Sequence, residues 1–533
     1  MLSFYRWFIS SVALFPVLAR SVAANIIVTG VRVDPTAPSL PPRRSIVDLQ
    51  ATGGPQCTGI HGKPFVEYDG TGPKDTDGWE GYCPHIEPLF LPWHRPYVVL
   101  FEQTLVEHAR TIALTYPEAY RAQYIEAADT LRAPFWDWAT DEAVPQATVP
   151  QTLSINVPAD KNDVKPKEVD NPLYTFKFTG AVLDGQFGTF DHSRRNQTYR
   201  CNEDPSMSYP ATANENLKAR NYKSLVYDTF TRSTEFSQFA TMEVSGVSLE
   251  AIHGGIHWDA GCRGQFLELE FTGFDPLFML HHANVDRLWA YWEAMSPEHR
   301  IFTGEYLSRG RWATRENTTI TTKSPLQPFR RSETDFHTTE SVQSIYDLGY
   351  SYYGLEYKNK DSEEKRQDVT RIINRLGPAS AGLSGRREHR RRSVRTRYFA
   401  HLSVELSEVE RPCSIELSMN GTLAGNLVLM SMPASGMAYG EVPLDAVQDK
   451  LRGKSDSDVL DTFESWLKID IIKADGSVVR AVDVPSMALQ IERVQVTTPQ
   501  TNTELPRYSG SQKFGVKVGK GASSSRVISA GVD

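Results

Sequence analysis

The chain has 533 residues, of which 40% are hydrophobic and 23% charged, and its net charge is −8 at pH 7. This length predicts two or three domains, and the composition is typical of a soluble globular protein. The acidic balance argues against nucleic-acid binding, because domains that bind nucleic acids are usually basic.

The first 24 residues have the pattern of a secretory signal peptide. Arg6 supplies a positive charge, the stretch from Trp7 to Leu18 is apolar, and small residues follow at Ala23 and Ala24. The apolar stretch is too short to span a bilayer comfortably, so we expect cleavage rather than anchoring, and no later segment reads as a span. We therefore expect the protein in the secretory pathway, destined for the cell exterior, the cell wall or a vacuole.

Two further features concern that route. Three sequons for N-glycosylation have Asn196, Asn317 and Asn420 as their acceptors. The chain also has five cysteines, an odd number, so at least one is left outside any internal disulfide.

Three stretches have the periodicity of helices. Apolar residues recur near a period of 3.6 over residues 95–116, and Pro117 marks the end of that helix. A shorter helix is predicted over 248–257. A third is predicted over 275–295, where an aspartate occupies the N-cap position and a proline the first helical position.

Residues 377–397 differ in composition from the 25–376 region before them. They begin with Gly-Pro-Ala-Ser-Ala-Gly and continue as an arginine-rich run from Arg386 to Arg397. This composition predicts a linker. Two interpretations stay open: a solvated basic loop, and a cleavage site for a protease that cuts after paired basic residues.

Residues 398–510 are predicted to form a compact antiparallel β domain. Asn420-Gly421 and Asp475-Gly476 are favourable hairpin turns. The tail over 511–533 is rich in glycine, serine and lysine, and we expect it to be disordered. The segments with strand-like alternation are 398–406, 414–419, 427–432, 467–472 and 489–496.

Seven of the 13 histidines fall into two groups: His61, His85 and His94, and then His253, His257, His281 and His282. On a helix, His253 and His257 lie one turn apart on one face and can bind the same metal ion. Gly254 stands where a zinc protease carries glutamate, which excludes that class. Either His281 or His282 can complete a site of three imidazoles, and the spacing does not choose between them.

Each group by itself has an ordinary explanation, since a pair of histidines at helical spacing often arises by accident. Three imidazoles with no thiolate suit copper, zinc or iron. Zinc hydrolases use one such set rather than two. The presence of both groups in one chain therefore favours a dinuclear metal site.

Two longer stretches resemble a known family. Leu91-Pro-Trp-His-Arg-Pro96 and Phe274-Asp-Pro-Leu-Phe-Met-Leu-His-His-Ala-Asn-Val-Asp-Arg-Leu-Trp289 are similar to the two copper-binding signatures of tyrosinases and catechol oxidases, the type-3 copper proteins. Val28-Thr-Gly-Val-Arg32 and Gly349-Tyr-Ser-Tyr-Tyr-Gly354 resemble fungal tyrosinases. The resemblance covers most of the chain.

The resemblance implies a mainly α-helical catalytic domain, built as a four-helix bundle around two copper ions, followed by a β-rich domain. His281 and Asp286 would lie behind the ligands, although Asp286 could instead pair with Arg287. The implied ligands are His61, His85 and His94 for the first copper, and His253, His257 and His282 for the second.

Cys83 and His85 match the fungal pattern in which the cysteine sulfur is joined to the histidine ring as a thioether. That bond would account for the odd cysteine. A free buried thiol and a disulfide with Cys57 are the alternatives.

The implied reaction uses O2 to oxidise o-diphenols to o-quinones, with ortho-hydroxylation of monophenols such as tyrosine as a second activity, in melanin or secondary-metabolite synthesis. In the family, a glutamate and an asparagine hold the water that takes the phenolic proton. Glu250 matches the glutamate, but Gly254 replaces the asparagine, so we expect monophenol hydroxylation to be limited. Leu269 lies near the position that gates the second copper.

The β-rich domain would cover the copper site and keep the enzyme latent until a protease cuts the linker. Met437 or Tyr439, in the loop over 433–439, is the expected side chain over the site. Two other functions stay open, a specialised oxidase of o-aminophenols and an oxygen carrier of haemocyanin type. The signal peptide and the basic linker favour an enzyme.

Overall fold

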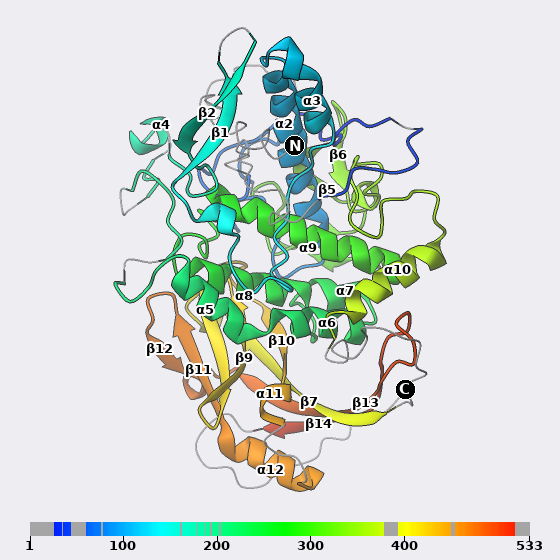
Figure 1. Ribbon diagram of the computed structural model, residues 1–533. Helices are drawn as coiled ribbons and strands as arrows, with labels where there is room; N and C mark the ends of the chain where they lie inside the picture. The colour runs from blue at the N-terminus through cyan, green and yellow to red at the C-terminus, as the bar shows by residue number, and fades with distance from the viewer. Residues whose placement is uncertain are drawn as a thin grey trace.

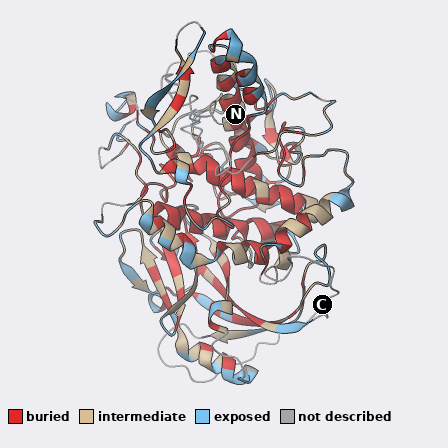
Figure 2. Ribbon diagram, in the orientation of Figure 1, coloured by how far each residue is buried: buried red, intermediate tan, exposed pale blue. Residues whose placement is uncertain are grey.

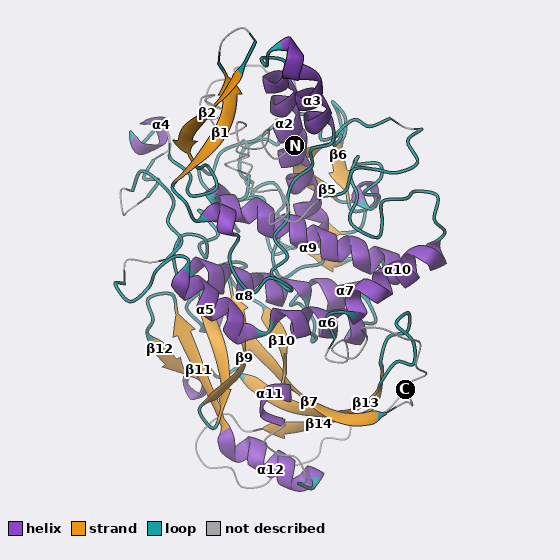
Figure 3. Cartoon of the chain, in the orientation of Figure 1, coloured by secondary structure: helices purple, strands orange, loops and turns teal. Residues whose placement is uncertain are grey.

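The structure is a computed structural model that describes residues 26–34, 36–43, 60–75, 78–159, 162–178, 180–186, 188–191, 195–201, 204–377, 393–448 and 454–516. The predicted signal peptide, Cys57 and most of the basic linker lie outside these residues. Figure 1 shows a helical part in the upper half of the view and a strand-rich part below it. Figure 3 shows the same division by secondary structure. The predicted fold class, a mainly α catalytic domain followed by a β-rich domain, is confirmed.

Among the described residues, three helices carry histidines: α2 (Phe90–Ala113), α8 (Leu249–Gly261) and α9 (Pro276–Met295). In Figure 1, α9 crosses the middle of the molecule, with α2 above it and α8 below. Packed around them are α3 (Glu118–Asp129) on α2, α5 (Ala211–Arg220) and α6 (Tyr222–Arg232) on α8, and α10 (Ser362–Asn374) on α9. No helix among the described residues is both long and apolar enough to cross a bilayer.

Local sequence sets where these helices begin. The Asp275 side chain accepts the N–H of Leu277 at 2.8 Å and caps α9, with Pro276 as its first residue. Ser248 caps α8 in the same way. Both predicted starts are confirmed. The α2 helix begins at Phe90, earlier than predicted, because its first turns are buried on every side and have no polar face to create a periodicity.

The remaining elements of the helical part are short. Some lie between α2 and α8, and the others follow α9. They are α4 (Gly180–Leu183), α7 (Phe236–Ala240), and the ribbons β1 (Thr152–Pro158) with β2 (Val164–Asp170), β3 (Tyr306–Leu307) with β4 (Thr319–Ile320), and β5 (Pro325–Arg330) with β6 (Phe336–Thr338).

The strand-rich part consists of two antiparallel sheets with the orders β10-β7-β13-β14 and β12-β11-β8-β9. Two short helices, α11 (Asp445–Gln448) and α12 (Asp456–Trp466), accompany them. The strands are β7 (Val394–Glu405), β8 (Cys413–Met419), β9 (Thr422–Leu429), β10 (Met437–Pro443), β11 (Leu467–Lys473), β12 (Val478–Arg480), β13 (Ala488–Thr497) and β14 (Arg507–Val516).

All five predicted strands are present, and so are both hairpin turns. Asn420 and Gly421 connect β8 to β9 with φ values of 47° and 72°, the positive values that a tight hairpin requires. Gly476, with φ of 87°, lies in the turn between β11 and β12.

Two predicted boundaries are wrong. The linker does not extend to residue 397, because β7 begins at Val394 and the side chain of Arg397 is buried against Asp228 of α6. Disorder does not begin at residue 511, because β14 runs to Val516. Backbone pairing with β13 holds this polar segment in place. Residues 517–533 lie outside the described part.

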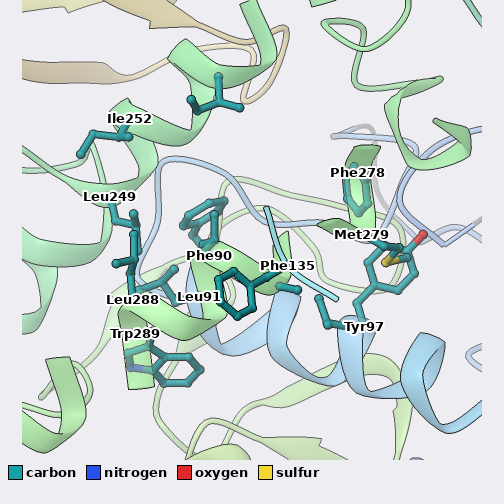
Figure 4. Packing of buried hydrophobic residues seen from close by; sticks show 14 of the residues in the cluster. Phe90, Leu91, Tyr97, Phe135, Leu249, Ile252, Phe278, Met279, Leu288 and Trp289 are labelled. Atoms are coloured by element: carbon teal, nitrogen blue, oxygen red, sulfur yellow. The ribbon is translucent and has the colours of Figure 1, made fainter. Parts of the chain in front are cut away.

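The two parts share their cores. Figure 2 shows buried residues continuing from the helices into the sheets. Val428, near the end of β9, and Met430, just after it, belong to the hydrophobic cluster of the helical part, which also holds Phe90, Leu249, Ile252 and Phe278 (Figure 4). In the opposite direction, Ile86 and Met242 belong to the cluster between the sheets.

Candidate metal centre

The structure brings together all seven histidines of the two predicted groups. His61 and His85 lie in the loops before α2, His94 lies in the first turns of α2, and the others lie on α8 and α9. Every one of these side chains is buried, and the most accessible, His85, is only 5% exposed.

The first three rings form a nearly equilateral triangle. Their centroids are separated by 5.6 Å for His61 and His85, 5.5 Å for His61 and His94, and 5.6 Å for His85 and His94. We call these three residues the first triad.

His253, His257 and His282 form the second triad. Its ring centroids are separated by 4.5 Å for His253 and His257, 4.9 Å for His253 and His282, and 5.9 Å for His257 and His282. The two triads adjoin each other, because the rings of His94 and His282 stack at 4.4 Å. The geometry therefore describes one centre with two halves.

Backbone carbonyls select which ring nitrogen is free in three of these residues. The Nδ1 atoms of His61, His94 and His257 lie 3.3 Å, 2.7 Å and 2.8 Å from the carbonyl oxygens of Leu269, Phe90 and Phe266. A carbonyl only accepts, so each Nδ1 carries the proton and each Nε2 keeps its lone pair. This is the usual arrangement behind a metal-binding histidine.

The free nitrogens converge, and apart from a contact between two histidines of the second triad they face no donor in the described part of the chain. The buried Nε2 atoms of His61 and His94 have no hydrogen-bond partner among the described residues. The Nε2 atoms of His253 and His257 face each other at 3.0 Å. Lone pairs gathered in a buried place are costly unless a cation compensates them. The donor set thus fits a pair of copper ions.

Burial also keeps these rings neutral. It lowers the pKa of His94 to about 3 and that of His257 to about 4. The pKa values of the other members of both triads are lowered by burial as well. At neutral pH all six rings are therefore in the form that binds a metal.

Trp138 distinguishes His281 from His282. The Nε1–H of Trp138 donates to Nδ1 of His281 at 3.0 Å. An indole only donates, so the neutral His281 ring carries its proton on Nε2 and has no lone pair left there. Both nitrogens of His282 lack a partner among the described residues. His282 is therefore the residue of this pair with a lone pair available to a metal.

Asp286 lies behind the centre in a buried charge network. Its carboxylate accepts from Arg95 at 2.5 Å and from Arg43 at 2.9 Å, and the hydroxyls of Tyr350 and Tyr352 donate to it at 2.7 Å each. It ties α9 to α2, the helices that carry His282 and His94.

The suggested pairing of Asp286 with Arg287 is wrong, because Arg287 pairs with Asp137 at 2.7 Å. Residues three positions apart on a helix carry their side chains on one face, whereas adjacent ones point in different directions.

Cys83 is a buried thiol in contact with the first triad. Its sulfur accepts from the indole of Trp79 at 3.1 Å and lies 3.3 Å from the carbonyl oxygen of His61. Its sulfur and donor atoms of His61 and His85 all lie within 4.8 Å of one another. Burial raises the pKa of the thiol to about 12. The alternative partner, Cys57, lies outside the described residues.

A disulfide joins Cys201 to Cys262. Sequence reasoning did not identify this pair, since 61 positions separate the two residues. Cys262 ends α8, the helix that carries His253 and His257. The fifth cysteine, Cys413, is a buried free thiol of β8.

Glu250 lies on α8, one turn before His253, and is 2% exposed. One carboxylate oxygen accepts the N–H of Ile86 at 2.6 Å. The other accepts the hydroxyl of Thr241 at 2.8 Å and the N–H of Met242 at 3.1 Å. Burial raises the pKa of this carboxyl to about 7. The predicted gate residue, Leu269, is buried, and its carbonyl contacts His61 of the first triad.

The two residues suggested to cover the site lie on a strand rather than in a loop. Met437 and Tyr439 are part of β10 and pair with Glu405 and Ser403 of β7. The end of β9 also approaches α8, the helix that carries His253 and His257. A Cβ atom placed on Gly254 would lie 3.3 Å from the carbonyl oxygen of Val428. Met437 and Tyr439 were expected in a loop, whereas pairing with β7 extends them as a strand.

Sequence reasoning missed Trp138, Arg43 and Val428. The aromatic run Phe135-Trp-Asp-Trp138 was a usable signal for Trp138, because buried indoles need a hydrogen-bond acceptor. No local pattern marks the other two.

A family model described as the common central domain of tyrosinase matches residues 54–295. The chain is 33% identical to a tyrosinase of Neurospora crassa over 319 residues, which are 56% of this chain and 46% of that protein. It is 31% identical to a tyrosinase of Podospora anserina over 408 residues, which are 67% of this chain and 70% of that protein.

In fold, the chain matches mushroom tyrosinase crystallised in latent and active forms, with a TM-score of 0.76 and 21% identity over 92% of this chain and 98% of that chain. A haemocyanin of Enteroctopus dofleini is more distant, at 25% identity over 307 residues and 8% of that protein. The extent of the match to the Podospora protein, together with the paired triads, places the chain in the tyrosinase family.

Proposed function

We propose that this protein is a copper-dependent phenol oxidase that uses O2 to convert o-diphenols into o-quinones. Tyrosinases are dinuclear copper enzymes, and the buried histidines supply donors for two ions. The observation that carries the proposal is the convergence of neutral nitrogen lone pairs from two adjoining triads.

The first triad would hold one copper ion and the second triad the other. When bound, the copper pair would supply the electrons that reduce O2 and would take electrons from the phenol. Six neutral imidazoles would not offset the positive charge of the two copper ions. The site would therefore attract an anion such as a phenolate. Arg43 and Arg95 both pair with Asp286, so the negative charge of its carboxylate is compensated within this network.

Oxidation of o-diphenols is proposed as the main activity, with limited hydroxylation of monophenols. Gly254 has no side chain to hold a proton-accepting water beside Glu250. The Glu250 carboxylate already accepts three hydrogen bonds, which leaves about one of its four lone-pair positions. The catalytic role of Glu250 as a base stays a prediction.

The C-terminal sheets are proposed to keep the enzyme latent. Val428 and Met430 of this part are packed into the core beside the histidines. A protease of the secretory route would cut after the paired arginines over 386–392, before β7 begins at Val394.

Secretion and its modifications remain part of the proposal. Asn196, Asn317 and Asn420 are all exposed, as acceptors of glycans must be. The thioether between Cys83 and His85 is supported by the proximity of the two side chains. The products would enter melanin or another secondary metabolite.

The test is O2 uptake by copper-loaded full-length protein, before and after limited proteolysis of the linker, with a catechol and then with tyrosine or tyramine. We expect uptake with catechol, an increase after cleavage, and slow uptake with tyrosine. Equal rates with catechol and tyrosine would show that Glu250 suffices without the asparagine.

Two results would replace the proposal. No uptake in either state, accompanied by reversible O2 binding, would identify an oxygen carrier. A strong preference for an o-aminophenol over catechol in direct competition would identify a specialised aminophenol oxidase.

A further inference from the structure

Ile86, which follows His85 directly, has an unusual backbone conformation. Its φ is 54°, in the left-handed region that β-branched residues rarely adopt. Such a conformation persists only where the surroundings hold it. The direction of the His85 side chain therefore depends on whatever holds Ile86.

Glu250 holds it. The N–H of Ile86 donates to the carboxylate at 2.6 Å, across 164 positions of sequence. The same carboxylate accepts the N–H of Met242 and the hydroxyl of Thr241. Because Glu250 lies one turn before His253, a single side chain joins the loop of the first triad to the helix of the second.

The C-terminal sheets contact the same two residues. Ile86 and Met242 are 1% and 2% exposed and belong to the hydrophobic cluster between the sheets. The carbonyl of Met242 also accepts the N–H of Tyr439 on β10 at 2.9 Å. Each residue that Glu250 binds through a backbone N–H is therefore packed against the C-terminal part by its side chain.

We propose that Glu250 is a positioning residue that fixes the His85 loop to α8, and so sets the separation of the two triads, and that the C-terminal sheets act on the triads through Ile86 and Met242. The contacts of Glu250 with Ile86, Thr241 and Met242, which we call the Glu250 clamp, do not depend on the chemistry of the centre. Its consequence for copper rests on the proposed function.

The test is Glu250→Gln in the copper-free full-length chain. The glutamine side chain has one oxygen, which accepts, and one NH2 group, which donates. Either the N–H of Ile86 or that of Met242 would therefore face a donor and lose its hydrogen bond. We expect hydrogen exchange at the amide of Ile86 or Met242 to become about tenfold faster or more, the effect of losing a charge-assisted hydrogen bond.

The matched control is Glu293→Gln. Glu293 is also buried, also has a pKa raised by burial to about 7, and pairs with Arg95 rather than with the His85 loop. Its replacement should leave exchange at Ile86 and Met242 unchanged. If exchange at Ile86 and Met242 became equally faster in both variants, the cause would be general destabilisation of the protein. That result would overturn the proposal for Glu250.

Copper content provides the second readout. Glu250→Gln should retain fewer than two copper ions per chain after dialysis, with tyrosine and catechol oxidation both reduced. A variant with unchanged exchange and two copper ions that loses only tyrosine hydroxylation would overturn the proposal and make Glu250 the base. Failure of the phenol oxidase proposal would leave the exchange result untouched.

Discussion

At the residue scale, the hydrogen bond on the far side of the imidazole decides which nitrogen can bind a metal in four of the seven histidines. Carbonyl oxygens accept from Nδ1 of His61, His94 and His257, so the ring proton lies on Nδ1 and the lone pair on Nε2. In His281 the indole of Trp138 donates to Nδ1, so the ring proton lies on Nε2. Neighbouring histidines on one helix therefore have different chemistry.

We predict that His282→Asn reduces the copper content of the loaded protein from two ions to one, while His281→Asn retains both. The amide oxygen of asparagine can still accept from Trp138 in the second variant, so the core is preserved. Copper per chain, measured by atomic spectrometry, checks this. Equal copper loss in the two variants would contradict the assignment of His282.

At the element scale, α8 is the helix on which most constraints meet. It carries two of the proposed ligands, contacts β9 through Gly254, and is joined by Cys262 to Cys201. Two predictions concern these contacts.

Gly254→Ala is expected to raise catechol oxidation by the uncleaved chain severalfold. The added Cβ would lie 3.3 Å from the carbonyl oxygen of Val428, so β9 must move back by a few tenths of an ångström. Gly255→Ala is the control, because its Cβ would meet the hydroxyl of Tyr222 on α6 at 2.8 Å, within the helical part. Activation by the control to the same extent would exclude β9 as the cover.

Replacing Cys201 and Cys262 together by serine should lower the free energy of unfolding. Closure of a loop with a sequence separation of 61 residues corresponds to about 4 kcal/mol in the chain-entropy description. Denaturant unfolding of the copper-free protein measures the difference. A change below about 1 kcal/mol would show that strain in the folded state, or residual structure in the unfolded state, offsets the entropy of loop closure.

At the scale of the whole molecule, buried ion pairs join the two parts. Arg232 of α6 pairs with Glu441 of β10 at 2.5 Å and with Glu492 of β13 at 2.6 Å. Arg397 of β7 pairs with Asp228 of α6 at 2.5 Å. Breaking one partner of such a buried pair typically costs about 3–5 kcal/mol.

Acid is expected to weaken the attachment of the C-terminal sheets. Burial alone would raise the pKa of Glu492, but the hydrogen bond from His401 and the charge of Arg232 outweigh it and lower the pKa below the ordinary value of 4.5. The stabilisation of the folded state by ionised Glu492 is therefore complete above pH 4.5 and is lost as the pH falls further. The groups that face Glu492 are Arg232, His401, Glu441 and Ser511.

The rate of proteolysis in the linker, measured from pH 7 to pH 3 with an acid-tolerant protease, checks this expectation. Linker cleavage should accelerate below pH 4.5 in the natural chain. Glu492→Gln, which lacks the titrating group, should show a smaller change across the same range. If the rate of linker cleavage had the same pH dependence in both proteins, the protonation of Glu492 would not contribute to the release of the C-terminal sheets.

Much of the fold follows from local patterns. The starts of α8 and α9 depend on Ser248, Asp275 and Pro276, whose capping roles are set by residues within one turn. The turn at Asn420-Gly421 depends on residues that tolerate positive φ. The strand at 507–516 was missed because its polar sequence has no pattern of its own and is held by pairing with β13.

The sequence by itself determined the chemistry of the donors, the two histidine groups and the family, because residue types and their spacing along the chain are enough for these. Only the tertiary structure decided that His282 rather than His281 has the available lone pair, that Glu250 binds Ile86, and that β9 covers Gly254. Each of these depends on an atom from a distant segment, and the contact exists only once both segments are buried together.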